Sequence, residues 1–369
     1  MLTTIIKKVE VIPFKIVNKR EVFWAAGSLP AAEHLIVKIE TEDGTYGVAE
    51  AIPRPMIYGE TQEGMYYALT KYLAPLIIGQ DSFALQKIWE KLDQVVWNPA
   101  AKGAIDVALY DLNARLLNIP VHKLMGGPYR TQIPISWQIG FGTNKEMLDE
   151  LKQKIVEGYR TFKVKGGPHP DNDIKVLKLM RENSPDDVRL YIDANMAYSR
   201  EDALRVMKAL EGVLASLEEP LISWDNEGRK DLANRVSTPI LSDESTFSVV
   251  DVYHQIQLGA LKQIGIKIPR TGFTLSTKIV HLAEVANMPI QVSLQAETDY
   301  GNAACIQFAC AHKQVSLPCE VSYYLDNIGD SLLQKPLVIK NGFMQLPEGP
   351  GMGVDLDWEK VHKYAIKIG

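Results

Sequence analysis

Four short apolar runs, most of them ending in charged residues, follow one another in the middle of the chain: RTFKVKG (160–166), RLYIDAN (189–195), ASLEEP (215–220) and PILSDES (239–245). Their length and their β-branched and aromatic content predict strands that are buried on both faces. The segments between them carry the three- and four-residue apolar spacing of helices. This alternation predicts consecutive βα units of a parallel sheet.

The same unit continues on both sides of this stretch. Strand-like runs also lie at residues 133–140, 262–268, 289–295 and 315–321, which makes eight strands in all. Helical patterns separate most of them, but the segment after the last strand, SYYLDNIGDSLLQKP, has only a weak one. Eight βα units in succession indicate a closed barrel. We therefore predict an α/β fold with a (β/α)7β TIM-type barrel.

The segments before and after the barrel have different patterns. Residues 1–50 alternate in strand fashion and residues 62–125 have helical spacing, which predicts an N-terminal α+β capping domain over residues 1–128. The barrel is expected over residues 129–336. The strand-like C-terminal segment, 337–369, is expected to return to the capping domain. No long linker separates these parts, so we expect the two domains to share an interface.

Composition excludes several classes of protein. The 369 residues carry a net charge of −5 without a basic run, which argues against a nucleic-acid partner. No apolar stretch approaches the roughly 18 residues of a membrane helix, so we expect no membrane partner. The three cysteines fit neither a zinc site nor a disulfide framework. We read them as reduced thiols and expect a cytoplasmic protein.

Acidic residues end three successive predicted strands. Asp193, Glu218 and Asp243 are each 25 residues apart (218−193 and 243−218), so one βα unit separates each pair. The carboxyl ends of barrel strands share one mouth, where three carboxylates repel unless a cation lies among them. Oxygen ligands without His or Cys favour Mg²⁺, with Mn²⁺ as the alternative ion. The other interpretation is that these acids cap the following helices.

Lysines occupy the same ends of other strands. Lys163 and Lys165 are two residues apart, so their side chains lie on one face of a strand. Lys267 ends a strand four positions further around the barrel, and therefore lies across the mouth. A lysine near other cations in a cavity can serve as a base, with Lys163 lowering the pKa of Lys165. The alternative is that the lysines only neutralise the acids.

Together these groups suit one reaction. A proton alpha to a carboxylate is very weakly acidic, so its removal needs a base and strong stabilisation of the resulting enediolate. A divalent ion supplies that stabilisation as a Lewis acid. We predict a metal-dependent enzyme that abstracts such a proton from a small carboxylate substrate.

The motif set resembles the enolase superfamily, and most closely its muconate lactonizing enzyme (muconate cycloisomerase) and mandelate racemase proteins. The resemblance covers essentially the whole chain and rests on five motifs: Lys163-Val164-Lys165, Asp193-Ala194-Asn195, Glu218-Glu219-Pro220, Asp243-Glu244-Ser245 and Lys267. It implies a Mg²⁺-dependent isomerase, either a cycloisomerase or a racemase or epimerase. Enzymes of this superfamily combine a lysine base with Mg²⁺, and the lysines and carboxylates of this chain fit that chemistry.

Residue roles follow from the resemblance. It implies that the metal ligands are Asp193, Glu218 and Asp243, and that the catalytic lysines are Lys165, Lys267 and Lys163. It further implies supporting or substrate-binding roles for Asn195, Glu244 and Glu297.

Specificity is harder to read. Dipeptide epimerases carry an Asp-x-Asp on strand eight, where this chain has Glu320-Val321-Ser322. Two loop-like segments of the capping domain, 22–28 and 53–60, are candidates to cover the mouth. In the second, Arg54 is a candidate to pair with a second substrate carboxylate and Tyr58 to close the cavity. Ordinary interface roles for both are the alternative.

Rival functions remain open. An o-succinylbenzoate-synthase-like or other dehydratase would use the same groups for β-elimination. A Schiff-base lyase or aldolase would use one lysine as a covalent nucleophile and leave the carboxylates without a role. A non-catalytic binding protein would need neither the lysines nor the acids. The resemblance also implies a homo-oligomer.

Overall fold

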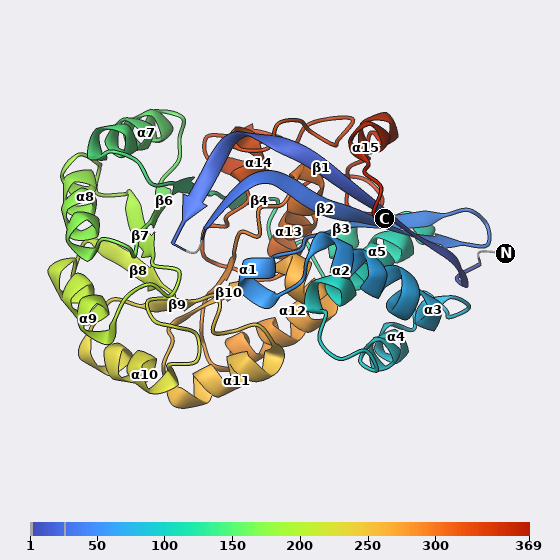
Figure 1. Ribbon diagram of the computed structural model, residues 1–369, viewed down its shortest axis with the longest axis horizontal. Helices are drawn as coiled ribbons and strands as arrows, with labels where there is room; N and C mark the ends of the chain where they lie inside the picture. Colours follow the sequence, from blue (N-terminus) through green and yellow to red (C-terminus); the bar gives the residue numbers. More distant parts are fainter. Residues whose placement is uncertain (1–2, 26) are drawn as a thin grey trace.

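The barrel is present in a computed structural model, which describes residues 3–25 and 27–369. Seven parallel strands lie in the order β11-β10-β9-β8-β7-β6-β5. Their bounds are β5 Ser136–Ile139, β6 Thr161–Lys165, β7 Arg189–Asp193, β8 Leu214–Glu218, β9 Ile240–Ser242, β10 Gln263–Ile266 and β11 Ile290–Val292. The helices that follow them form the outer layer (Figure 1): α7 Asn144–Val156, α8 Pro170–Glu182, α9 Arg200–Ala209, α10 Asn226–Arg235, α11 Val249–Leu258, α12 Ile268–Val285 and α13 Asp299–Ala311.

An extended segment at residues 317–320 closes the barrel. On one side Glu320 N donates to Val292 O of β11 at 2.9 Å. On the other side Ser136 N of β5 donates to Cys319 O at 2.8 Å. This segment is the predicted eighth strand, and it is followed by the four-residue helix α14 (Tyr323–Asp326) rather than a full barrel helix. The prediction of a (β/α)7β barrel is confirmed.

The capping domain begins with an antiparallel sheet of β1 (Ile6–Trp24), β2 (Gly27–Thr41) and β3 (Tyr46–Ala51). A series of helices follows: α1 Pro55–Tyr58, α2 Gln62–Tyr67, the π-helix Ala68–Leu73, α3 Ala74–Ile77, α4 Leu85–Leu92, α5 Pro99–Leu116 and α6 Val121–Leu124. This is the predicted α+β arrangement, and it lies to the right of the barrel in Figure 1.

Helix α5 joins the capping sheet to the barrel. It packs between β3 and α12, and almost all of its residues are buried. Two glycines allow the close approach: a Cβ at Gly47 of β3 would lie 2.2 Å from Ala108 O, and one at Gly103 would lie 2.8 Å from Pro269 O. The two domains therefore share an extensive interface around this helix.

The long β1–β2 hairpin reaches from the capping domain over the barrel mouth (Figure 1). Lys19 N donates to Asn327 O at 2.8 Å, and Arg20 pairs with Glu150 of α7 at 3.3 Å. The hairpin tip includes most of the predicted segment 22–28, although Ala26 lies outside the described residues. This segment is thus near the mouth, as the sequence predicts for a covering loop.

The C-terminal segment lies against both parts of the chain. Strands β12 (Ile339–Lys340) and β13 (Phe343–Gln345) form a small sheet with β4 (Gln132–Pro134). Helix α15 (Trp358–Tyr364), which the sequence pattern did not predict, precedes a bridge from Ala365 to Phe14 of β1. The domain bounds stay predictions. No described helix has the length and apolar character needed to cross a membrane.

Candidate active site

Strand register brings the predicted residues together at the mouth. Lys165 of β6 is the backbone partner of Asp193 of β7, and Asp193 is the partner of Glu218 of β8. Asp243 follows the end of β9, and Lys267 directly follows β10. Because parallel strands end at the same rim, these side chains form one row around the cavity.

Lys163 lies among three carboxylates. Its Nζ atom lies 3.0 Å from Asp193 Oδ2 and 2.8 Å from Glu218 Oε2. Glu320 Oε1 lies 3.0 Å from the same nitrogen. Burial disfavours the ammonium form, but the attraction of these acids outweighs it and raises the pKa of Lys163 well above its usual range. Lys163 is thus a cationic centre of the cluster rather than a free base.

The two other lysines are each paired with one acid. Lys165 Nζ donates to Asp193 Oδ2 at 2.6 Å and to Asn195 Oδ1 at 2.9 Å. Lys267 Nζ donates to Asp243 Oδ2 at 2.6 Å. Strands β6 and β10 are four positions apart in the barrel, so Lys165 and Lys267 face the cavity from opposite walls. The structure brings together every lysine that the sequence singled out.

The acids carry opposite pKa shifts. Burial opposes ionisation of Asp193, but Lys163 and Lys165 outweigh it and lower its pKa. Burial and then repulsion by Asp193 raise the pKa of Glu218 well above the usual range. Burial and the neighbouring Asp243 raise the pKa of Glu244 to about 8. Without further positive charge, the cluster therefore cannot ionise all of its carboxyl groups easily.

These acids fit a divalent cation chemically. Asp243 Oδ1 and Glu244 Oε2 are buried and have no hydrogen-bond donor. A cation that prefers oxygen ligands would stabilise the ionised form of a carboxyl group with a raised pKa. It would also give the unpartnered carboxylate oxygens a partner. Within residues 3–25 and 27–369, no three His, Cys, Asp or Glu side chains converge as a preformed metal cluster. Asp193, Glu218 and Asp243 instead face lysines.

Two supporting residues predicted from the sequence also lie in this cavity. Asn195 Nδ2 donates to Glu244 Oε1 at 3.2 Å, and Asn195 Oδ1 accepts from Lys165. Asn195 has φ of 42°, a left-handed conformation that asparagine tolerates. This pair links the rims of β7 and β9.

Two other candidates do not line the cavity. Both carboxylate oxygens of Glu297 lie 3.0 Å from Gln295 N, and burial raises the pKa of Glu297 to about 7. The Tyr58 hydroxyl donates to Ile52 O at 2.6 Å, and Ile57 lines the cavity in its place. Neither side chain lines the cavity, so the structure gives no contact that supports their predicted roles next to the substrate.

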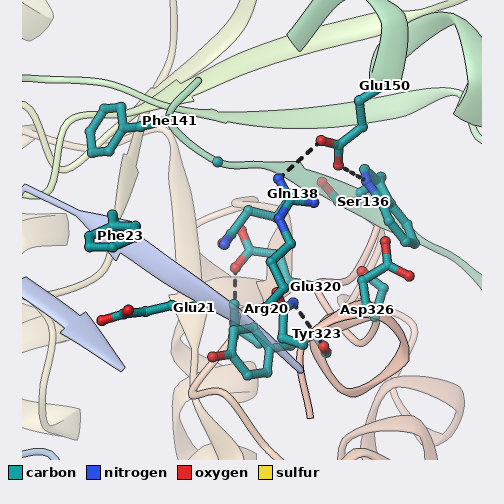
Figure 2. A pocket seen from close by; sticks show the side chains of 15 residues that line it. Arg20, Glu21, Phe23, Ser136, Gln138, Phe141, Glu150, Glu320, Tyr323 and Asp326 are labelled. Carbon is teal, nitrogen blue, oxygen red and sulfur yellow. Dashed lines mark hydrogen bonds and ion pairs between the residues drawn. The ribbon is translucent and has the colours of Figure 1, made fainter. Parts of the chain in front are cut away.

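The cavity lies between the barrel rim and the capping domain. Its polar walls come from the lysines and acids described above, and the capping domain adds these residues: Trp24, Leu29, Arg54 and Ile57. A second cavity, of about 160 Å³, adjoins it at Gln138, Leu294 and Tyr323. Figure 2 shows this second cavity with Phe23 and Phe141 toward one end and Glu150 toward the other. The site is therefore larger than the space between the lysines.

Glu320 is a site residue that the sequence motifs did not single out. Its carboxylate accepts from Lys163, from Tyr191 Oη at 2.6 Å and from Leu294 N at 2.9 Å. It ends the eighth strand, so the register argument used for the other acids could have found it. Arg270 was also missed: its Nη1 lies 3.6 Å from Asp243 Oδ1.

Family models cover most of the chain. Residues 8–126 match the mandelate racemase / muconate lactonizing enzyme N-terminal domain. Residues 146–361 match the enolase C-terminal domain-like family. The first match corresponds to the capping sheet with its helices, and the second to the barrel from α7 onward with most of the C-terminal segment.

Individual proteins are similar over nearly their whole length. A hydrophobic dipeptide epimerase of Enterococcus faecalis is 32% identical over 358 residues, which are 95% of this chain and 99% of the epimerase. Muconate cycloisomerase 1 of Rhodococcus opacus is 30% identical over 346 residues, 92% of each chain. The crystal structure of a muconate lactonizing enzyme from Mycobacterium smegmatis, complexed with muconolactone, has a TM-score of 0.94 at 34% identity. That match covers 98% of this chain and 100% of the other.

Proposed function

We propose, from the premise that this chain belongs to the mandelate racemase / muconate lactonizing enzyme family of the enolase superfamily, that Lys165 and Lys267 move a proton at the carbon alpha to a substrate carboxylate. Its relatives are cycloisomerases, epimerases and racemases, and the chain is an isomerase of this superfamily. We further propose which residues act in the reaction, which metal they hold and which class of substrate they bind.

One observation carries the proposal: two lysines on opposite walls reach one cavity. Lys165 and Lys267 each lie 2.6 Å from a carboxylate oxygen, which holds their ammonium groups at the rim. A planar carbon between them presents one face to each lysine. One lysine, as the amine, can then accept a proton, and the other, as the ammonium, can donate one.

Asp193, Glu218 and Asp243 would hold a divalent ion, usually Mg²⁺ in this superfamily and with Mn²⁺ as the alternative. When bound, the ion supplies Lewis-acid stabilisation of the negative charge that develops on the substrate carboxylate. Lys163 supports the same site, because its charge balances Asp193 and Glu218 from below. Glu244 and Asn195 orient the rim on the side of Lys165.

We favour a muconate-cycloisomerase-like reaction or a racemisation or epimerisation of a small acid. Two facing lysines support racemisation, because each can serve one configuration of the substrate. Dipeptides are less favoured as substrates, because this chain has Glu320-Val321-Ser322 where dipeptide epimerases carry an Asp-x-Asp on strand eight. Elimination, as in an o-succinylbenzoate synthase, would use the same lysines with a different leaving group.

Solvent deuterium exchange tests the proposal. Muconates, N-acyl amino acids, dipeptides and proline derivatives are incubated with the enzyme and Mg²⁺ in D₂O and followed by mass spectrometry. We expect label at the α-carbon in one class, and its loss in EDTA. No exchange or turnover in any class, or full exchange in EDTA, would contradict the proposal.

We also propose that the protein is cytoplasmic and forms a homo-oligomer. All three cysteines are buried free thiols, which fits a reducing compartment. Light scattering coupled to size exclusion would test the second part: a mass of one 41.2 kDa chain would contradict it.

A further inference from the structure

Arg54 brings a buried guanidinium to the catalytic cavity. It precedes α1 in the capping domain, lines the cavity, and has 6% of its surface exposed. Its three hydrogen bonds go to uncharged acceptors. Arg54 Nη1 donates to Pro53 O at 2.6 Å and to His34 Nε2 at 3.3 Å, and Nη2 donates to Gln295 O. No carboxylate of residues 3–25 and 27–369 pairs with it within 4.0 Å.

Other buried arginines of this chain are compensated differently. Arg229 lies 2.7 Å from Glu219, and Arg270 lies 3.6 Å from Asp243. A buried cation without a counter-charge is costly, and a buried partner of opposite charge offsets part of that cost. Burial lowers the pKa of Arg54, and attraction by Glu297 and Glu50 does not compensate. Arg54 therefore has unused capacity for a negative charge at the cavity wall.

His34 lies between Arg54 and Glu50, an acid of the capping domain. Because arginine only donates, His34 Nε2 must accept from Arg54, so the proton is on Nδ1, which lies 2.6 Å from Glu50 Oε1. Burial lowers the pKa of His34, which keeps the ring neutral. The imidazole thus orients the guanidinium through a hydrogen bond but does not neutralise it.

Glu50 is occupied elsewhere. Its Oε2 accepts from Thr298 Oγ1 at 2.7 Å and from Gly301 N at 3.0 Å, at the start of α13. Both residues follow β11, the seventh barrel strand. The hydrogen bonds from Glu50 through His34 to Arg54 therefore link a cavity-lining guanidinium to the barrel. The negative charge of Glu50 interacts with the N-terminus of α13 and not directly with Arg54.

We infer that Arg54 binds a second anionic group of the substrate, a carboxylate remote from the reacting carbon, and that His34 is the positioning residue that holds Arg54 for it. The inference rests on the proposed function, which assigns the first carboxylate to the metal side of the cavity. Nε–H and one Nη2–H of Arg54 have no partner among the described residues, and two such donors suit a carboxylate.

Binding of matched ligand pairs tests the inference without turnover. Titration calorimetry with Mg²⁺ would compare succinate, adipate and cis,cis-muconate with their monomethyl esters. We expect wild-type protein to bind at least one diacid ten-fold or more tightly than its monoester. Arg54→Gln should remove this preference and leave monoester affinity within about three-fold. Equal affinity for both forms, no binding of any diacid, or a preference that survives Arg54→Gln would overturn the inference.

Two His34 variants separate positioning from folding. His34→Phe keeps the ring volume but offers no acceptor, and should reduce the diacid preference at least five-fold. His34→Gln retains an acceptor oxygen and should recover most of it. If both variants keep the full preference while the circular dichroism spectrum is native, His34 has no positioning role. If His34→Phe does not fold, a wild-type preference in His34→Gln combined with its loss in His34→Ala supports the role, and retention in both contradicts it.

The same titrations distinguish this inference from the proposed function. In a Lys165→Ala protein the diacid preference should persist although proton exchange with one configuration of the substrate is lost. A preference without any exchange in wild-type protein would refute the proton transfer and leave Arg54 as an anion site. Exchange without a preference would do the reverse.

Discussion

Glu219 and Arg229 form an ion pair in which neither side chain has exposed surface, with Oε1 and Nη2 2.7 Å apart. The other carboxylate oxygen of Glu219 accepts from Asp243 N at 2.8 Å and from Ser245 N at 3.0 Å. The pair thus fixes the backbone that carries Asp243 at the barrel rim. Glu219, next to Glu218 in the sequence, is a structural support for the acids and not one of them.

Removing Arg229 should destabilise the fold strongly. In Arg229→Gln the carboxylate of Glu219 stays buried without its cation, and we expect a loss of roughly 3–5 kcal/mol in the free energy of unfolding. Urea denaturation measures it. The control is Arg235→Gln on the same helix, whose exposed pair with Asp231 spans 3.0 Å. That change should cost less than about 1 kcal/mol. Equal effects of the two variants would contradict the role of the buried pair.

Glu60 should make stability depend on pH. Burial raises its pKa to about 7 from 4.5, although Ala100 N and Ala101 N donate to it at the start of α5. The folded state therefore holds this proton more tightly than the unfolded state, so the stabilisation is complete below pH 4.5 and is lost as pH rises through 7. The free energy of unfolding of Glu60→Gln should rise relative to wild type by about 3 kcal/mol between pH 4.5 and 8.

Urea denaturation at several pH values would check this prediction. The control is Glu63→Gln, because Glu63 is exposed on the neighbouring helix α2. Its stability difference from wild type should stay nearly constant over the same range. If the stability difference between Glu60→Gln and wild type does not change with pH, folding does not disfavour the ionised form of Glu60.

Metal binding should depend on Glu218 and not on Glu297. Calorimetric titration of the metal-free protein with Mg²⁺ is expected to show at least a ten-fold weaker affinity for Glu218→Gln, because one carboxylate ligand is lost. Glu297→Gln is the matched control: Glu297 is equally buried, but its carboxylate is turned to Gln295 N. Unchanged affinity in Glu218→Gln would exclude Glu218 as a ligand.

The sequence predicted the barrel and its rim residues for a physical reason. Side chains of parallel strands share one rim, so the equal spacing of Asp193, Glu218 and Asp243 is enough to place them side by side. The register of β6, β7 and β8 agrees with that expectation. Residue type and strand position together therefore predicted most of the polar cavity wall.

Long-range contacts set what the sequence did not predict. The predicted strand at residues 133–140 is divided, because Gln132–Pro134 pairs with the C-terminal segment and only Ser136–Ile139 joins the barrel. Tyr58 and Glu297 were expected at the cavity, but local backbone groups take their polar atoms. Glu320 was not singled out because it was compared only with the Asp-x-Asp of dipeptide epimerases, although its place near the end of the predicted strand 315–321 puts it at the rim.

Stereospecific exchange in single-lysine variants measures whether Lys165 and Lys267 act on opposite faces of the substrate. Each configuration of the substrate found in the screen would be incubated in D₂O with Lys165→Ala, Lys267→Ala and the exposed-lysine control Lys175→Ala. We predict that each site variant loses exchange with one configuration, by about 10²-fold or more, and keeps some with the other, while the control behaves as wild type. For a substrate without a stereocentre, the same experiment follows the face that receives deuterium. Loss of the same configuration in both variants, or undiminished exchange of both configurations in either, would show that the two lysines do not act on opposite faces of the substrate.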